Sequence, residues 1–206
     1  MSGSRERVFV VDDNPGIRRS LSRLLRSAGF EPIAFGSGEE FLSQLPADAS
    51  GCLILDISMP GLDGLALQRE ISSRGNGLAI VFLTGHGDIP KSVHAMRSGA
   101  ADFLTKPVDD EVLLRAVRQA LDSERSGRQA RHEVAGIERL LASLTERERE
   151  VLDGVVAGRL NKQIAGDLGI TEKTVKVHRS RVMAKMQASS LAELVHLIDR
   201  ARSGRR

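Results

Sequence analysis

Short apolar runs alternate with helical patterns over residues 7–122, and this alternation constrains the fold more than any other feature of the chain. The runs hold four to six residues, which is the usual length of a buried strand. The segments between them repeat apolar residues three and four positions apart, as helices that cover a sheet do. Because each parallel strand needs a crossover connection, repeated strand-helix-strand units build a parallel sheet. The pattern predicts a doubly wound α/β domain.

The predicted elements begin and end at recognisable boundary residues. Asn14 is suited to cap the first helix with Pro15 at its first position, and Gly29 ends that helix. Ser37 and Glu40 have capping-box spacing at the start of the second helix. We predict strands over 8–11, 31–35, 51–55, 78–83 and 101–104, and helices over 15–28, 37–45, 64–74, 88–98 and 109–121. The first domain is therefore a five-stranded parallel sheet flanked by helices.

A second, smaller all-α domain is expected, because 206 residues exceed the usual size of a single core. Four short helical patterns fill the C-terminal part of the chain. Capping boxes open the first and last of them, as Thr145 with Glu148 and Ser190 with Glu193. The two middle helices, 161–168 and 171–186, are joined by the short turn Gly169-Ile170. This spacing is typical of a helix-turn-helix.

The boundary between the domains is predicted to be a partly helical linker over 122–143, which separates a first domain at 1–121 from a second at 144–206. The linker is rich in Arg, Ser and Glu and contains Gly127 and Gly136. Apolar residues nevertheless keep helical spacing through it, at Val134, Ile137, Leu140, Leu141 and Leu144. The pattern leaves two alternatives open: the linker extends the preceding helix, or it packs against a partner.

Charge is distributed unevenly between the two domains. Residues 1–121 hold 13 Lys and Arg against 15 Asp and Glu, a net −2, whereas residues 122–206 hold 17 against 12, a net +5. A basic second half suggests a nucleic-acid partner, although a solvated basic surface has the same composition.

Several classes of protein are disfavoured by the composition. Cys52 is the single cysteine and lies within an apolar run, so a buried inert thiol is expected and no intrachain disulfide can form. Residues 1–7 lack the apolar core of a signal peptide, and no run of about 18 apolar residues is present to cross a membrane. We therefore expect a cytoplasmic protein with no membrane partner.

Five polar residues follow four of the predicted strands, at the edge where the carboxyl ends of parallel strands meet. They are Asp12, Asp13, Asp56, Thr84 and Lys106. Crowded carboxylates repel one another unless a cation intervenes, and Mg²⁺ prefers such hard oxygen ligands. With the metal bound, Asp56 is suited to attack a phosphoryl group, while Lys106 and Thr84 hold its oxygens. Taken singly, each residue is also explained as a helix cap, a turn residue or a surface lysine.

The first domain resembles the receiver domain of two-component signalling proteins, and the whole chain resembles response regulators of the NarL/FixJ type. The matching segments are Val10-Val11-Asp12-Asp13-Asn14, Leu55-Asp56-Ile57-Ser58-Met59-Pro60-Gly61, Thr84-Gly85-His86-Gly87-Asp88 and Phe103-Leu104-Thr105-Lys106-Pro107. The resemblance implies a flavodoxin-like fold, phosphorylation by a sensor histidine kinase, and a homodimer in the phosphorylated state.

The same resemblance implies a role for each residue of the pocket. Asp56 is the phosphoacceptor, and the Mg²⁺ ligands are Asp13, Asp56 and the carbonyl of Ser58, with Asp12 acting mainly through water. Lys106 is the counter-ion of the phosphate, and its peptide bond to Pro107 is expected to be cis. Thr84 and Phe103 are the switch pair, in which the ring follows the hydroxyl. Ser58 and His86 tune the lifetime of the acyl phosphate, and Val108 stands where many relatives have Phe.

The second middle helix carries a basic face suited to a major groove. Opposite its packing residues Val175, Val182 and Met186 lie Lys173, Lys176, Val177, Ser180 and Arg181. Lys176 and Arg181 offer donors to guanine edges, and Val177 offers an apolar contact to a thymine methyl. Lys162, Thr171, Glu172 and Thr174 at the helix starts, with Arg179, complete the predicted DNA-binding set.

The C-terminal domain resembles the LuxR-type helix-turn-helix, through Asn161-Lys162-Gln163-Ile164-Ala165 and Thr174-Val175-Lys176-Val177-His178. This resemblance implies double-stranded DNA with paired half-sites as the partner. In relatives the last helix, with Leu191, Leu194, Val195 and Ile198, makes the dimer contact, although packing within the domain also explains it.

Two other functions compete with a phosphorylation-switched transcription regulator. In the first, the receiver is only a dimerisation or partner-binding module and DNA binding is constitutive. In the second, the chain is an aspartate-nucleophile phosphatase. Such enzymes place the nucleophile after the first strand with another Asp two residues later, whereas Asp56 is followed two residues later by Ser58. The pattern therefore favours a protein that is not an enzyme beyond its own phosphotransfer and dephosphorylation.

Overall fold

The computed structural model describes residues 6–46, 49–85, 93 and 95–203. The chain divides into two compact units, Met1–Arg128 and Gln129–Arg206. No described helix is both long enough and apolar enough to cross a membrane.

The first unit is built on a five-stranded sheet in the order β2-β1-β3-β4-β5. The strands are β1 (Arg7–Val11), β2 (Glu31–Phe35), β3 (Cys52–Leu55), β4 (Ala79–Thr84) and β5 (Asp102–Thr105), and every neighbouring pair is parallel. From β1 the chain crosses to one side to form β2 and then to the other to form β3. The predicted doubly wound, flavodoxin-like sheet is confirmed, with strand bounds within one residue of those expected.

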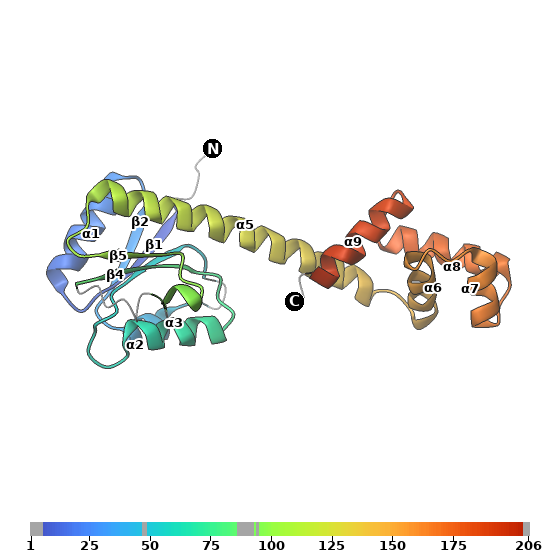
Figure 1. The fold of residues 1–206 in the computed structure, drawn as a ribbon, viewed down its shortest axis with the longest axis horizontal. Coiled ribbons are helices and arrows are strands. Elements are labelled where there is room, and N and C mark those ends of the chain that lie inside the picture. The colour runs from blue at the N-terminus through green and yellow to red at the C-terminus, as the bar shows by residue number, and fades with distance from the viewer. Residues whose placement is uncertain (1–5, 47–48, 86–92, 94, 204–206) are drawn as a thin grey trace. The chain divides into compact units, whose positions relative to one another are not determined.

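Helices cover both faces of this sheet (Figure 1). They are α1 (Pro15–Ser27), α2 (Gly38–Gln44), α3 (Gly64–Ser73) and α5 (Asp110–Ala142). Alternate residues of β1 face opposite layers: Val8 and Val10 pack on the α1 and α5 side, and Phe9 and Val11 on the α2 and α3 side. Burial on both faces explains why the strands are continuous apolar runs. The helix predicted over 88–98 lies mostly outside the described residues.

The helix starts follow the predicted capping chemistry with two variations of one kind. Asn14 caps α1, and its Oδ1 accepts from the backbone N–H groups of Gly16 and Ile17. Ser37 caps α2 by accepting from Glu40 N–H, but the Glu40 carboxylate accepts from Gly36 N–H. In the predicted Ser190 and Glu193 box, Ser190 accepts from Glu193 N–H, but the Glu193 carboxylate accepts from Ser189 N–H. The reciprocal half of each of these two boxes is therefore made one residue earlier than its spacing predicts.

Helix α5 does not end at Leu121 as predicted but runs without a break to Ala142. The segment beyond 121 is rich in good helix formers, and Ile137, Leu140 and Leu141 join the core of the second unit on one helical face. Interior glycines cost about 1 kcal/mol each in a helix, so Gly127 and Gly136 do not outweigh this packing. Of the two alternatives for the linker, extension of the preceding helix is correct.

The second unit packs four further helices around its own apolar core. They are α6 (Glu146–Val156), α7 (Asn161–Leu168), α8 (Glu172–Lys185) and α9 (Leu191–Ser203). Gly169 closes α7 with φ +65°, a left-handed conformation that glycine adopts readily. Val175, Val182 and Met186 pack with Ile164 as predicted, and Leu168 packs at the edge of the same cluster. The predicted helix-turn-helix is therefore formed by α7 and α8.

Candidate functional site

The parallel register brings the predicted pocket residues together at one edge of the sheet. Val11 pairs with Leu55, which pairs with Phe82, so the residues after β1 and β3 leave the sheet at the same level. Backbone bonds continue this alignment past the strand ends, from Asp56 N–H to the Val11 carbonyl (3.0 Å) and from Lys106 N–H to the Thr84 carbonyl (2.7 Å). Residues separated by more than 90 positions thereby become neighbours.

Three carboxylates gather at this edge with different degrees of burial. Asp12 is 2% exposed and Asp56 is 8% exposed, whereas Asp13 is open to solvent. One ligand oxygen from each of the three lies within 4.8 Å of the others. Buried carboxylates so close together repel one another strongly. The site consequently requires positive charge.

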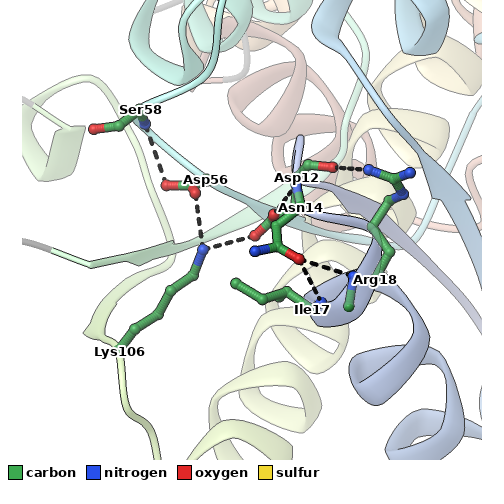
Figure 2. Close-up of polar contacts among 8 residues, drawn as sticks. Asp12, Asn14, Ile17, Arg18, Asp56, Ser58 and Lys106 are labelled. Atoms are coloured by element: carbon green, nitrogen blue, oxygen red, sulfur yellow. Dashed lines mark hydrogen bonds and ion pairs between the residues drawn. The ribbon is translucent and has the colours of Figure 1, made fainter.

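Lys106 supplies that charge by bridging the two buried carboxylates (Figure 2). Its Nζ donates to Asp12 Oδ2 at 2.6 Å and to Asp56 Oδ2 at 2.8 Å. Burial by itself would lower the pKa of this ammonium, but the hydrogen bonds and negative charges of Asp12 and Asp56 more than offset it, so the pKa is raised. Lys106 is therefore held protonated between them. The Lys106-Pro107 peptide bond is cis, as predicted.

The other oxygen of Asp56 and its strand end are positioned by the loop that follows. Ser58 N–H donates to Asp56 Oδ1 at 3.2 Å (Figure 2). Gly64, the first residue of α3, lies so close that a Cβ atom there would stand 2.3 Å from the Asp56 carbonyl oxygen. A side chain at Gly64 therefore cannot be accommodated without moving the backbone of the phosphoacceptor candidate. The local sequence pattern marks Gly64 only as the start of a helix.

A second basic side chain supports the turn that carries Asp12 and Asp13. Arg18 Nη1 donates to the Asp12 carbonyl oxygen at 2.6 Å, and Asn14 N–H donates to Asp12 Oδ1 at 2.8 Å (Figure 2). These bonds hold the turn between β1 and α1, from which both Asp12 and Asp13 project. Sequence reasoning missed Arg18, although its place on the first turns of α1, after the capping Asn14, puts it within reach of this loop.

Thr84 and Phe103, the predicted switch pair, lie on the neighbouring strands β4 and β5, and no contact between their side chains is described. Thr84 is 2% exposed at the end of β4. Phe103 is partly buried on β5, and its ring centroid lies 6.3 Å from that of Phe82, its partner across the strands. Ser58 is exposed, two residues after Asp56. His86 lies outside the described residues.

The residues at this edge fit a hard divalent cation. Asp12, Asp13 and Asp56 present oxygen ligands from two neighbouring loops, and the exposed side of Asp13 leaves room for water ligands. Lys106 already binds one oxygen of Asp12 and one of Asp56. The arrangement is compatible with Mg²⁺.

Helix α8 presents the predicted DNA-binding face to solvent. Lys173, Lys176, Val177, Ser180 and Arg181 are all exposed, and Val177 is among the most exposed large apolar residues described. At the start of α8, the Thr171 hydroxyl accepts from Thr174 N–H, and the two hydroxyls lie 2.9 Å apart. Lys162, Thr171 and Glu172 are also exposed at the starts of α7 and α8.

Arg179 and His178 are placed differently from the rest of the predicted DNA-binding segment. Arg179 is half-buried, and its Nη1 donates to Asn161 Oδ1 at 3.2 Å, so its guanidinium is turned toward the start of α7. His178 is also half-buried, with a buried Nδ1 that has no hydrogen-bond partner in the described part of the chain. Neither side chain belongs to the exposed face of α8.

An ion pair between half-buried Lys185 and buried Glu148 fixes the far end of α8, and the sequence indicated only the Glu148 side of it. The predicted capping box is formed by Thr145 and Glu148. Lys185 Nζ adds a bond of 2.6 Å to Glu148 Oε2 and one of 3.0 Å to the Ser143 carbonyl. The Lys185 hydrogen bond, followed by that of Thr145 N–H, lowers the pKa of Glu148 to about 2. This network ties α8 to the residues just after α5.

The two units match two described families. Residues 8–118 match the response regulator receiver domain, and residues 142–198 match the bacterial regulatory proteins of the luxR family. Nodulation protein W of Bradyrhizobium diazoefficiens is 47% identical over 92% of this chain and 84% of that protein. The transcriptional regulatory protein FixJ of Azorhizobium caulinodans is 47% identical over 92% of this chain and 90% of its own length. A solved structure of the response regulator StyR matches with a TM-score of 0.86 and 47% identity, covering 95% of this chain and 99% of that one.

Proposed function

The chain belongs to the two-component response regulators of the NarL/FixJ type, which join a receiver domain to a LuxR-type DNA-binding domain, and we propose that Asp56 is the residue whose phosphorylation switches it. As a member of this family it is a phosphorylation-dependent transcription regulator. The observation that carries the assignment of Asp56 is the Lys106 bridge, because it holds a buried carboxylate beside the cation that would later pair with a phosphate.

Phosphoryl transfer at Asp56 follows from the chemistry of the surrounding groups. An Asp56 oxygen attacks the phosphorus of a phosphohistidine on a sensor kinase, the P–N bond breaks, and the released imidazole keeps its electron pair. Lys106 then pairs with a phosphate oxygen instead of the Asp56 carboxylate. Mg²⁺ held by Asp13, Asp56 and the Ser58 carbonyl, with Asp12 acting through water, would offset negative charge on the transferring oxygens.

Thr84 and Phe103 change position in response to the phosphorylation of Asp56. The Thr84 hydroxyl donates to a phosphate oxygen, and the partly buried ring of Phe103 follows it into the space that the hydroxyl leaves. The change at β4 and β5 favours a homodimer. The receiver, over 1–121, catalyses only its own phosphorylation and dephosphorylation.

The phosphorylated protein acts by binding double-stranded DNA through the domain at 144–206, whose α8 enters the major groove. Lys176, Val177 and Arg181 contact base edges, and Lys173 and Ser180 lie beside them on the same face. Lys162, Thr171, Glu172 and Thr174 lie where helix starts meet phosphates, and Arg179 acts there through Asn161. A dimer would bind two half-sites. With DNA as the partner, the cytoplasm is the working compartment.

The proposal is tested with the full chain, a small phosphodonor such as acetyl phosphate, and Mg²⁺. Wild type should gain one phosphoryl group by intact mass, and the gain should disappear without Mg²⁺. Asp56→Asn should gain none, while the matched surface control Asp110→Asn should behave like wild type. Equal phosphorylation of Asp56→Asn would show that another residue accepts the group.

The same samples separate this function from its closest rival. Phosphorylated protein should have a larger solution mass and bind operator DNA more tightly than the unphosphorylated protein. If both forms bind the same DNA equally, the receiver is only a dimerisation or partner-binding module. Multiple turnover of a phosphate ester would instead indicate a phosphatase.

A further inference from the structure

A cavity of about 550 Å³ opens at the edge of the sheet opposite to Asp56, entirely within the first unit. It lies where β1 and β2 begin and where the chain enters β3, and α5 closes one side of it. Its apolar wall is formed by Ile33 and Leu121, and its polar groups include Glu124 and Arg128 of α5. None of the pocket residues assigned to phosphoryl transfer lines this cavity.

Glu124 is the feature of this cavity that points to a ligand. Its side chain is only 4% exposed, and its Oε1 atom is buried without a hydrogen-bond partner among the described residues. The Arg128 Nε atom lies 3.4 Å from that oxygen, which is an ion-pair distance without hydrogen-bond geometry. A buried carboxylate oxygen that accepts no hydrogen bond is unfavourable, because it has lost its hydration.

Arg128 is a loose partner for this carboxylate. Its side chain is 47% exposed, and its Nη1 reaches the Ser50 hydroxyl only at 3.5 Å. The neighbouring Arg125 pairs with Glu6 at the rim, so its charge is already engaged. An incoming cation with N–H donors can therefore satisfy Glu124 Oε1 more directly than Arg128 does.

We propose that this cavity is a binding site for a small organic cation, a primary amine or guanidine with a short apolar chain. The N–H groups would donate to Glu124 Oε1, and the apolar chain would lie on Leu121 and Ile33. Arg7, Arg125 and Arg128 also line the cavity, but the buried carboxylate of Glu124 disfavours an anion beside it. A divalent metal fits poorly, since the described groups of three or more metal-ligating residues reduce to Asp12, Asp13 and Asp56 at the other edge.

Binding at this site contacts α5 between Leu121 and Arg128, beyond the 8–118 segment that matches the receiver family. It does not involve Asp56, so the ligand would act independently of phosphorylation. The inference therefore goes beyond the proposed function, and either one can fail without the other.

The test uses the full chain with n-butylamine and agmatine as probes and n-butyltrimethylammonium as the control. The control has the same charge and the same butyl chain as n-butylamine but no N–H donor. Both probes should raise Tm and give saturable heat in calorimetric titration, and the control should do neither. Glu124→Gln should weaken binding at least about tenfold, because a charge-assisted hydrogen bond is lost. Glu111→Gln, an exposed change on the same helix, should bind like wild type.

Three outcomes would overturn the proposal. They are no saturable binding of either probe, equal binding of n-butyltrimethylammonium, and unchanged affinity in a folded Glu124→Gln variant. If circular dichroism shows that Glu124→Gln is unfolded, Ser50→Trp fills the cavity from its rim without altering Glu124. Probe binding that survives in Ser50→Trp also overturns the proposal. Asp56→Asn should bind the probes normally, which separates this site from the phosphorylation pocket.

Discussion

The pocket around Asp56 and the exposed face of α8 use charge in opposite ways. The pocket joins side chains from four separate segments, and its key groups, Asp12 and Asp56, are almost completely buried. The α8 face is one stretch of a single helix, and Lys173, Lys176 and Arg181 stand in solvent. Charges interact strongly where water is excluded and weakly where it is not. Pocket residues should therefore depend on one another, whereas residues on the α8 face should act almost independently.

The largest effect is expected from Lys106→Met. Loss of the ammonium leaves Asp12 and Asp56 facing each other without compensation and removes the counter-ion of the phosphate. Phosphorylation by acetyl phosphate should slow by about 100-fold or more. Mg²⁺ affinity, measured by titration calorimetry, should rise, because the competing cation has gone. Lys162→Met should change neither quantity. A Lys106→Met protein that is phosphorylated at the wild-type rate would show that the charges around Asp56 do not depend on one another.

Double-mutant cycles test the same difference between the residues around Asp56 and the exposed face of α8. In the pocket, Asp12→Asn and Lys106→Met should couple strongly, since the two groups share a bond of 2.6 Å. On α8, Lys173→Ala and Lys176→Ala should add within about 0.5 kcal/mol in DNA-binding free energy. Comparable coupling in both pairs would show that burial is not what separates the two regions.

On the DNA side, Lys176→Ala should cost about 1–3 kcal/mol and relax the base preference at one position of each half-site. Lys173→Ala should instead weaken all sequences similarly and reduce the salt slope by about 1. Arg179→Ala should leave base preference unchanged, because its guanidinium bonds to Asn161. Affinities measured on a panel of operator variants at several salt concentrations distinguish these results. Altered base preference in Arg179→Ala would place that side chain in the groove.

Gly64→Ala tests whether the backbone of the pocket tolerates movement. The added Cβ would meet the Asp56 carbonyl oxygen at 2.3 Å, so the receiver should lose about 1–3 kcal/mol of stability. Gly136→Ala is the matched control, because nothing lies within 4 Å of its Cβ position inside α5. That change should stabilise the helix by up to about 1 kcal/mol. Chemical denaturation followed by circular dichroism checks both, and an unaffected Gly64→Ala protein would contradict the close approach.

The smallest expected effect concerns Glu148. Like Asp12 and Asp56, it is a buried carboxylate that accepts a hydrogen bond from a lysine, although it lies in the DNA-binding unit. Its pKa of about 2 in the folded state is lower than its ordinary value near 4.5, so folding favours the ionised form. The resulting stability is present above about pH 5 and is lost as pH falls toward 2. In Glu148→Gln, unfolding of the second unit should depend less on pH over that range. Thermal melts between pH 2 and 7 measure the difference, with exposed Glu172→Gln as the control.

Much of this could be predicted because the relevant signals are local. The strands are continuous apolar runs, and Asn14, Thr145 and Gly169 mark helix boundaries through chemistry that depends on near neighbours. Helix α5 was predicted too short because Gly127 and Gly136 weaken the local signal, while the packing of Ile137 and Leu140 that sustains the helix is not local.

Residue spacing was enough to predict the sheet, the helix-turn-helix and the residues placed at the strand ends, since periodicity and capping depend on neighbours a few positions apart. The pairing of the charges, in contrast, follows from the folded arrangement of distant segments. This arrangement placed Lys106 between Asp12 and Asp56, turned Arg18 to the Asp12 carbonyl and Arg179 to Asn161, joined Lys185 to Glu148, and buried Glu124. These pairings depend on distances between segments far apart in the chain and on exclusion of water, and neither is encoded in the spacing of residues.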